Sequence, residues 1–308
     1  MCNRLYFWPN IPVAGKAVCV CARVPNCNPR SAICIAAPLA AAPLPLAPQP
    51  RAIGHLRLSS KADNRLDGLY QAGALKAVFP RRRGAALDAV VVNTAGGITG
   101  GDRFDITASA GPNSHLTLTT QSAERAYAAQ PGQTGRVTVQ IDVGRKARID
   151  WLPQETILFE RCNLRRQLSV SLAADASFLM VEPLVFGRMA MGEALHAARL
   201  RDRIRIDRDG VPLYRDGLDL TGDIAARLMR SAVAGGARAM ASVVLVDAQA
   251  ESHLDALRDL LPDSAGVSLI GDMLVLRIVA SDSFTLRQTL LPALEQMLPQ
   301  TLPRCWRL

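Results

Sequence analysis

Aromatic residues, histidines and long apolar runs are all scarce in this sequence of 308 residues. Phe, Trp and Tyr together make up 5% of the chain, and its four histidines lie far apart. No uninterrupted apolar run reaches the roughly 18 residues that a membrane-spanning helix requires, so we expect no transmembrane segment. Because 49% of the residues are hydrophobic and 20% are charged, the chain can still bury a large core.

Motifs of the common enzyme classes are missing as well. The sequence has no HExxH or HxH pattern and no G-x-S-x-G nucleophile elbow. The glycine-rich segment 96–102 (GGITGGD) lacks both the lysine of a phosphate-binding loop and the spacing of a dinucleotide-binding loop. Carboxylate catalysis needs no sequence motif, so a carboxylate-dependent hydrolase on a β-rich fold remains an alternative. The spacing of Glu155 and Glu160, however, does not single them out as an acid and a base.

The charge balance is strongly basic, with a formal net charge of +9 and an isoelectric point near 9.6. Such a charge suits an acidic partner or nucleic acid. The main arginine clusters of the body are Arg81-Arg82-Arg83 and Arg165-Arg166, and no aromatic residues that stack on bases are interleaved with them. A basic nucleic-acid-binding protein is therefore kept only as a second alternative, and we expect neither nucleic acid nor a membrane as partner.

Residues 1–50 differ from the rest of the chain. They contain no Asp or Glu, nine of the 19 prolines and five of the seven cysteines. Each proline removes a backbone donor and restricts the residue before it, so we predict a disordered Pro/Ala-rich extension. A signal peptide fits less well because prolines interrupt its apolar part. A zinc knot fits less well because a C-x-C pair with lone cysteines is not the usual ligand spacing.

The remainder of the chain holds two cysteines, Cys162 and Cys305. A body with so few cysteines favours a reducing compartment, and therefore a cytoplasmic location. We interpret both cysteines as small apolar residues without a ligand role.

Residues 51–220 alternate between apolar and polar side chains, which is typical of half-buried strands. The Asp209-Gly210 pair between two such runs predicts a hairpin turn. Regularly spaced short strands of this kind predict a large β-rich body. The clearest runs are 104–108, 116–118, 137–143, 168–172 and 204–206.

Residues 221–308 predict a smaller α+β part. Apolar residues spaced by three and four indicate helices near 224–232, 254–261 and 290–298, the last one kinked at Pro292. Strands are predicted at 240–246, 267–270 and 273–279. The predicted organisation is therefore an extension (1–50), a β-rich body (51–220) and an α+β part packed on it (221–308).

Five short segments, in this order along the chain, resemble the UreD (UreH) family of urease accessory proteins. They are 96–102 (GGITGGD), 118–121 (LTTQ), 151–159 (WLPQETILF), Glu182 with Gly187-Arg188 and Met191-Gly192-Glu193, and 303–307 (PRCWR). The chain departs from the family at Thr94-Ala95, where prolines are usual. It departs again at Glu124-Arg125, where a small residue and a lysine usually precede a tyrosine. Residues 1–50 match nothing in the family.

The resemblance implies a nickel-insertion chaperone rather than an enzyme. It implies binding to the urease apoprotein subunits and to UreF, which in turn holds the GTPase UreG. It also implies that nickel(II) passes in transit through a water-filled interior passage, with no permanently bound cofactor. The implied fold is a β-rich superhelical body of many short strands with a few helices, in agreement with the alternating pattern.

A conduit for nickel needs weak, exchangeable oxygen ligands, because imidazole and thiolate hold nickel tightly. We therefore expect Asp102, Glu182 and Glu193 to approach or line the passage. The competing interpretation is that Glu182 and Glu193 pair with Arg188 and only hold the fold. The other candidate motif or partner-contact residues are Gly96, Gly97, Gly100, Gly101, Thr119, Thr120, Gln121, Pro153, Gln154, Arg188, Arg304 and Trp306. Whether the C-terminal segment with Trp306 docks on its own body or on UreF is left open.

Overall fold

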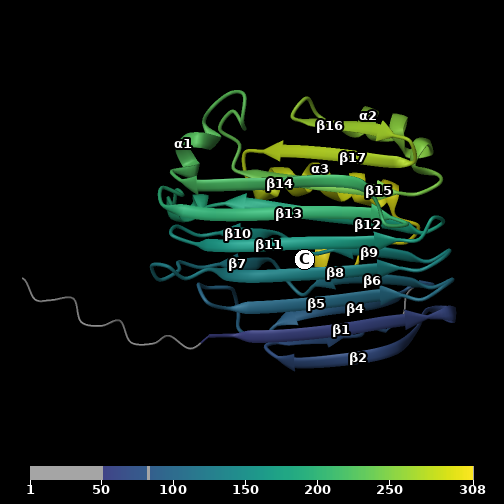
Figure 1. Cartoon of the computed structure of the whole chain (residues 1–308). Helices are drawn as coiled ribbons and strands as arrows, with labels where there is room; N and C mark the ends of the chain where they lie inside the picture. Colours follow the sequence, from purple (N-terminus) through teal and green to yellow (C-terminus); the bar gives the residue numbers. More distant parts are fainter. Residues whose placement is uncertain (1–50, 82–83, 308) are drawn as a thin grey trace, which may run out of the picture. The chain divides into compact units, whose positions relative to one another are not determined.

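The computed structural model describes residues 51–81 and 84–307, so the prediction for residues 1–50 lies outside the described residues. Figure 1 shows a body built mainly of strands, with a few helices toward its C-terminal end. This arrangement confirms the predicted fold class.

The strands form two sheets. Sheet A has the order β14-β13-β11-β8-β5-β1-β2, and sheet B has the order β16-β17-β15-β12-β9-β6-β4-β3, with β10 and β7 attached beside β12. The strands of sheet A are β1 (Ile53–Lys61), β2 (Arg65–Gly73), β5 (Arg103–Ala110), β8 (Gly135–Val143), β11 (Asn163–Leu172), β13 (Ala198–Arg208) and β14 (Val211–Gly222). The strands of sheet B are β3 (Leu75–Val78), β4 (Leu87–Asn93), β6 (His115–Thr120), β7 (Glu124–Ala126), β9 (Arg148–Leu152), β10 (Thr156–Leu158), β12 (Ser177–Phe186), β15 (Ala239–Val246), β16 (Ala265–Ile270) and β17 (Met273–Ala280).

Between β4 and β13 the chain passes back and forth between the two sheets and so winds as a β-solenoid. Strands β5, β8, β11 and β13 are parallel neighbours in sheet A, and β4, β6, β9 and β12 are parallel neighbours in sheet B. Each passage from A to B is a four-residue turn, closed by a bond from its fourth N–H to its first carbonyl. These bonds are Ser114 to Gly111, Ala147 to Gly144 and Ala176 to Ala173, at 3.1–3.2 Å.

The return passages from sheet B to sheet A are longer and lie together at the opposite end of the solenoid, on the left in Figure 1. They comprise residues 94–102, 121–134, 153–162 and 187–197. All four contain residues of the segments that resemble the UreD family. The fold therefore gathers these segments at one end of the solenoid.

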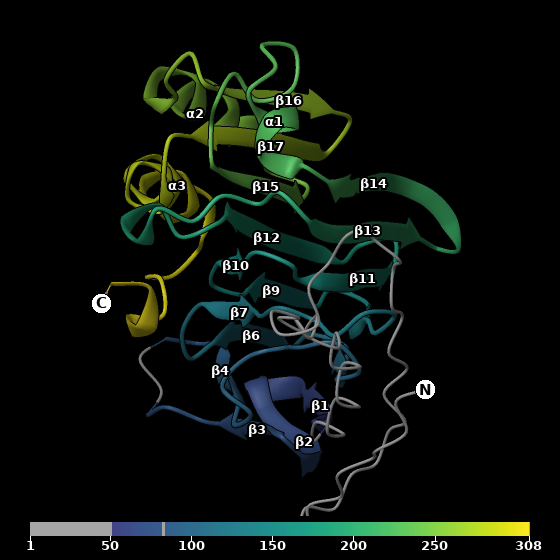
Figure 2. The same cartoon turned by 90° about the vertical axis from the view of Figure 1, so that its left-hand side faces the viewer.

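Two apolar cores hold the body together. The larger lies between the sheets and includes Phe104, Ile141 and Phe178. The second lies between the outer face of sheet B and the C-terminal helices, and includes Leu290 and Trp306. Figure 2 shows the two sheets end-on, with α3 beside sheet B. Because one face of sheet A stays polar, its strands keep the alternating pattern of a half-buried sheet.

The helices are α1 (Ile224–Leu228), α2 (Leu254–Leu260) and α3 (Ser283–Met297), with short 3-10 turns η1 (Ala62–Asn64), η2 (Met189–Met191), η3 (Ala250–His253) and η4 (Arg304–Arg307). The side chains of Asp223 and Asp282 accept hydrogen bonds at the N-termini of α1 and α3, which explains where these helices begin. Helix α1 ends earlier than predicted, and α3 continues through Pro292. The predicted strands of this part correspond to β15, β16 and β17.

The hairpin predicted at Asp209-Gly210 is confirmed, since both residues have positive φ (48° and 75°) between β13 and β14. The alternating runs in β5, β6, β8, β11 and β13 are also confirmed as strands. The central strands β9 and β12 of sheet B were not predicted. Four of the five residues of β9 and nine of the ten residues of β12 are buried, so their sequences lack the apolar-polar alternation that marks the others.

Candidate functional site

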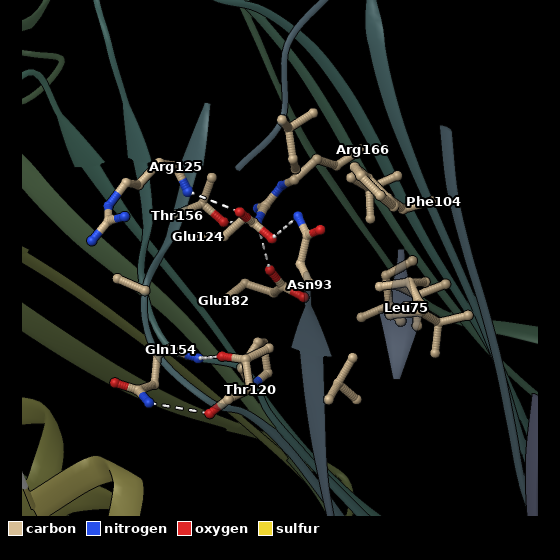
Figure 3. A pocket seen from close by; sticks show the side chains of 18 of the residues that line it. Leu75, Asn93, Phe104, Thr120, Glu124, Arg125, Gln154, Thr156, Arg166 and Glu182 are labelled. Carbon is tan, nitrogen blue, oxygen red and sulfur yellow. Dashed lines mark hydrogen bonds and ion pairs between the residues drawn. The ribbon is translucent and has the colours of Figure 1, made fainter. Parts of the chain in front are cut away.

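A cavity of about 240 Å³ lies between the two sheets. Its lining combines inward-facing apolar side chains, among them Leu75 and Phe104, with a few polar groups. Figure 3 shows the carboxylates of Glu124 and Glu182 beside the guanidinium of Arg166, with Leu75 on the other side of the view. The cavity therefore combines an apolar lining with a small set of charged groups.

Three of the cavity's residues form an ion-paired group that we call the buried triad: Arg166, Glu182 and Asp202. The Arg166 Nη1 atom lies 3.0 Å from Glu182 Oε2, and its Nη2 pairs with the Asp202 carboxylate. The Glu182 Oε1 atom also accepts a hydrogen bond of 2.8 Å from the indole N–H of Trp151. Glu182 is thus held by Arg166. The competing interpretation of the sequence had paired it with Arg188 instead.

Strand register explains how the buried triad forms. Arg166 and Asp202 are direct neighbours across the parallel pair β11–β13, at positions where both strands otherwise point apolar side chains inward. Glu182 reaches the same space from β12 in the opposite sheet. The Arg166 Nε atom is buried and has no hydrogen-bond partner among the described residues.

The electrostatics of the buried triad follow from its burial. Burial raises the pKa of Glu182 above its ordinary value and Asp202 adds to this effect, while Arg166 and Trp151 oppose it. Burial alone would lower the pKa of Arg166, but the carboxylates of Asp202 and Glu182 outweigh it and hold that pKa above its ordinary range. With both carboxylates ionised, the buried triad carries one net negative charge.

A third carboxylate, that of Glu124 on β7, also lines the cavity. Its Oε2 accepts a hydrogen bond of 3.0 Å from Asn93 Nδ2, and its Oε1 accepts one from the backbone N–H of Arg125. Burial raises the pKa of Glu124, and these two bonds lower it only in part. Glu124 stands at one of the two places where the sequence departs from the UreD pattern.

Asp102 closes the glycine-rich segment rather than lining the cavity. Its Oδ1 accepts a hydrogen bond from the N–H of Ala52, and its Oδ2 accepts one from the N–H of Thr99, both at 2.8 Å. The side chain is buried, with 3% of its surface exposed. Both carboxylate oxygens therefore anchor the backbone of the segment.

The glycines of this segment allow close packing. A Cβ atom on Gly97 would lie 2.2 Å from the Tyr127 ring, and one on Gly100 would lie 2.8 Å from the Cβ atoms of Ala129 and Gln133. Gly96 and Gly101 have positive φ, as the sequence predicts for a tight turn. Of these four, only Gly96 is among the cavity's lining residues.

Glu193 and Arg188 form a separate surface pair. The guanidinium of Arg188 donates to both carboxylate oxygens of Glu193, at 2.9 and 3.0 Å, as the competing interpretation predicted for this residue. It also lies 4.3 Å from the centroid of the Phe159 ring, which meets Tyr127 edge-on. Neither Glu193 nor Asp102 lies among the residues that line the cavity, so the structure brings only Glu182 of the three predicted carboxylates to it.

The remaining predicted residues of the 118–121 and 151–159 segments range from buried to exposed, with Thr120 half-buried and Gln121 exposed. Gln154 Nε2 donates to the carbonyls of Thr120 and Gln121, and its backbone N–H donates to Thr120 Oγ1. Gln154, Pro153 and Thr119 are buried. Thr120, Gln121, Pro153 and Gln154 line the cavity as well.

The C-terminal segment docks on its own body. Trp306 is fully buried, and its indole N–H donates to Thr119 Oγ1 and to the Leu152 carbonyl, both at 3.1 Å. Arg287 of α3 lies 5.5 Å from the Trp306 ring centroid. Arg304 of the same segment is exposed. This result answers the question that the sequence left open.

The two cysteines of the body are free. Cys162 is buried, and burial raises the pKa of its thiol to about 12. Within residues 51–81 and 84–307, no group of three or more His, Cys, Asp or Glu side chains is arranged to hold a metal ion. None of the helices in that part of the chain is long and apolar enough to cross a membrane.

Sequence reasoning missed Arg166, Asp202 and Glu124 as cavity residues. The first two were detectable, because each occupies an inward position of an alternating strand where an apolar residue is expected. Glu124 had no such signal, because β7 has only three residues.

Comparison with known proteins points to the same family as the segments that the fold gathers. The family model "UreD urease accessory protein" matches residues 52–307. The urease accessory protein UreD of Roseobacter denitrificans is 53% identical over 264 residues, covering 84% of this chain and 96% of that protein. The UreD of Ruegeria pomeroyi is 53% identical over 242 residues, covering 78% and 94%, and that of Rhizobium leguminosarum bv. viciae is 41% identical over 263 residues, covering 84% and 96%. The chain therefore belongs to the UreD family of urease accessory proteins.

Proposed function

We propose that this protein is a cytoplasmic urease maturation chaperone. It binds the urease apoprotein subunits and UreF, and through UreF the GTPase UreG. Nickel(II) passes through its interior cavity toward the urease metallocentre. Membership of the UreD family supports the accessory role, and the cavity between the sheets, with the carboxylates of Glu124, Glu182 and Asp202 in its lining, supports the passage.

The cavity's chemistry suits brief contact with a divalent cation. Glu124, Glu182 and Asp202 offer carboxylate oxygens, which bind nickel less tightly than imidazole or thiolate does. A nickel ion here would meet one or two carboxylates at a time, with water completing its coordination shell. With both carboxylates ionised, Arg166 leaves the buried triad a single net negative charge, which keeps the affinity for a cation low enough for release.

The buried triad also supports hydration of the cavity. The buried Arg166 Nε atom has no partner among the described residues, and a buried polar atom normally bonds to protein or to ordered water. A cavity of about 240 Å³ has room for several water molecules. Bound waters also supply the exchangeable ligands that a moving ion needs.

The deciding experiment is urease activation in cells that express the urease operon with a variant of this chain. In Glu182→Gln and Asp202→Asn, we expect nickel per purified urease to fall severalfold while the complex with urease and UreF still forms. Asp255→Asn is the matched control, because this carboxylate is almost fully exposed on α2. Normal nickel loading by both cavity variants, with complexes intact, would exclude the cavity route.

The same assay tests the nickel roles proposed for Asp102 and Glu193. Both carboxylates already have protein partners, so Asp102→Asn and Glu193→Gln are compared in complex assembly as well as in nickel loading. A loss of assembly would assign the residue to structure. A loss of nickel alone would assign it to the passage.

We further propose that the chain acts as an accessory protein and not as a catalyst. Its relatives are named for an accessory role. The purified chain without partners is expected to hydrolyse no ester, amide or urea substrate. Turnover that depends on Glu182 and Asp202 would favour the hydrolase alternative instead.

A further inference from the structure

The outer face of sheet A carries four arginines in one row. Arg103, Arg136, Arg165 and Arg201 occupy the same register position on the parallel neighbours β5, β8, β11 and β13. All four are exposed. We call this set the arginine row. It crosses the sheet near the first residues of these four strands, next to the long return passages that precede them.

Like charges in this arrangement repel one another. Neighbouring strands lie about 4.7–4.9 Å apart, and like charges directly opposite each other on a sheet are destabilising. Arg201 has an acidic neighbour, Asp219, at 3.9 Å. The side chains of Arg103, Arg136 and Arg165 make no ion pair or hydrogen bond within the described part of the chain. The arginine row is therefore a concentration of positive charge that its own chain neutralises at one end.

Within residues 51–81 and 84–307, no helix covers the face that carries the row. Helices α2 and α3 pack against sheet B, and no described helix lies over sheet A in Figure 1 or Figure 2. Parallel sheets are usually covered on both faces. A parallel face that no described helix covers, with three of its four row arginines unpaired among the described residues, is a surface suited to an acidic partner.

We propose that the arginine row docks an acidic helix of a partner protein. The arginine guanidinium matches a carboxylate with two parallel hydrogen bonds. Carboxylates four residues apart on a helix have Cβ atoms about 5–6 Å apart, close to the strand spacing of the row. Alternate residues of an extended segment are about 6.6 Å apart and lose register along the row. The helix would lie across the strands, with one acidic side chain for each arginine.

Nucleic acid is the less suitable occupant. Surfaces that bind single strands combine basic residues with aromatic side chains on which bases stack. The outward positions of β5, β8, β11 and β13 hold no Phe, Tyr or Trp. This inference does not depend on the proposed route for nickel, because the row lies on the outside of the body.

The test uses the purified full-length chain and a helical peptide of about 20 residues, a length that supports a helix in water. Its glutamates are spaced alternately by three and four residues, so that they share one face. Binding is measured by calorimetry at low and at high salt. We expect the wild-type chain to bind this peptide, with affinity that falls as salt rises, and not to bind the same peptide with glutamine in place of glutamate.

In Arg136→Gln/Arg165→Gln, the affinity should fall about tenfold, since each exposed ion pair contributes modestly. The control Arg65→Gln/Arg230→Gln removes the same charge from exposed arginines outside the row and should leave binding unchanged. In Arg136→Glu/Arg165→Glu, binding should switch toward a peptide with lysine at the same positions. Equal losses in the row and control variants, or tighter binding of duplex or single-stranded DNA than of the peptide, would overturn the proposal.

Discussion

The carboxylate of Glu155 accepts two hydrogen bonds from the guanidinium of Arg287, 2.6 Å to Nε and 2.9 Å to Nη2. The same Arg287 donates to Gln154 Oε1 at 2.9 Å and to the Trp306 carbonyl at 3.2 Å. One side chain of α3 thus holds the 153–155 segment, which forms part of the cavity wall, and the C-terminal segment together.

Replacement of Arg287 by alanine leaves the Glu155 carboxylate buried without its cation. We expect the free energy of unfolding to fall by about 2–4 kcal/mol, because an unpaired buried charge costs several kcal/mol. Arg287→Lys should recover only part of this loss, since lysine cannot form both bonds at once. Urea denaturation measures the effect. Glu295→Gln, which removes an exposed partner of Arg307, serves as the control and should change little.

Trp306→Phe tests the docking of the C-terminal segment. Phenylalanine retains most of the buried ring but loses the N–H that bonds Thr119 and Leu152, so we expect a loss of about 1–2 kcal/mol. Trp306→Ala should cost about 3–5 kcal/mol, because a large buried side chain is removed. Equal stability of the phenylalanine variant and the wild type would show that the indole bonds contribute nothing.

Gly97→Ala should destabilise the chain more than Gly132→Ala. A methyl group on Gly97 meets the Tyr127 ring and the Arg125 carbonyl, whereas one on Gly132 meets no atom within 4 Å. Gly132 has a φ of 76°, so alanine there costs about 1 kcal/mol from backbone strain alone. We expect the Gly97 variant to lose at least about 2 kcal/mol in thermal or urea denaturation. A smaller loss than that of the Gly132 variant would contradict the close packing.

Asp150→Asn should reveal a pH-dependent contribution to stability. Asp150 is fully buried, with Arg148 Nε 2.8 Å from Oδ1 and His115 Nε2 2.6 Å from Oδ2. Burial alone would raise the pKa of Asp150, but Arg148 and His115 outweigh it and hold that pKa below the usual 3.8. At pH 7 the variant should lose about 3–5 kcal/mol.

The sign of the pH effect follows from the lowered pKa of Asp150. An acid whose folded-state pKa is depressed stabilises the fold above its unfolded-state pKa, and the stability is lost as pH falls through the folded-state value. The difference between wild type and Asp150→Asn should therefore shrink below about pH 4. Urea denaturation from pH 7 to pH 3 measures it, with Asp255→Asn as the control. A difference that stays constant with pH would argue against an ionised Asp150.

The half-buried strands could be predicted because sheet A keeps one polar face. Strands such as β8 alternate cleanly for that reason. Strand β12 escaped prediction because it lies in the centre of sheet B, between the inter-sheet core and the helices, and so is apolar throughout. The sequence also could not predict that neighbouring strands run parallel, since the apolar-polar alternation is the same in parallel and antiparallel pairs.

The sequence could reveal residues of the site in two cases only. Either a charged residue interrupts the alternating pattern of a strand, or the residue belongs to a segment that resembles the family. Glu182 was found from its segment, and it lines the cavity between the sheets. Its partner Arg166 was noted only as part of a basic cluster, although its inward position on β11 marks it as a buried charge. The pairing of Trp306 with Thr119 joins residues far apart in the chain, and no local pattern encodes such a contact.

The three four-residue turns from sheet A to sheet B carry a constraint on evolution. The backbone N–H of Gly144 donates to the Ala110 carbonyl at the end of β5, and that of Ala173 donates to the Val143 carbonyl at the end of β8. These two turns are therefore hydrogen-bonded to the end of a neighbouring strand in sheet A. An inserted or deleted residue there would shift a whole strand by one position and expose its apolar side. Length changes among relatives of this chain should therefore accumulate in the long return passages, so that one rim of the solenoid can vary in length while the opposite rim stays fixed.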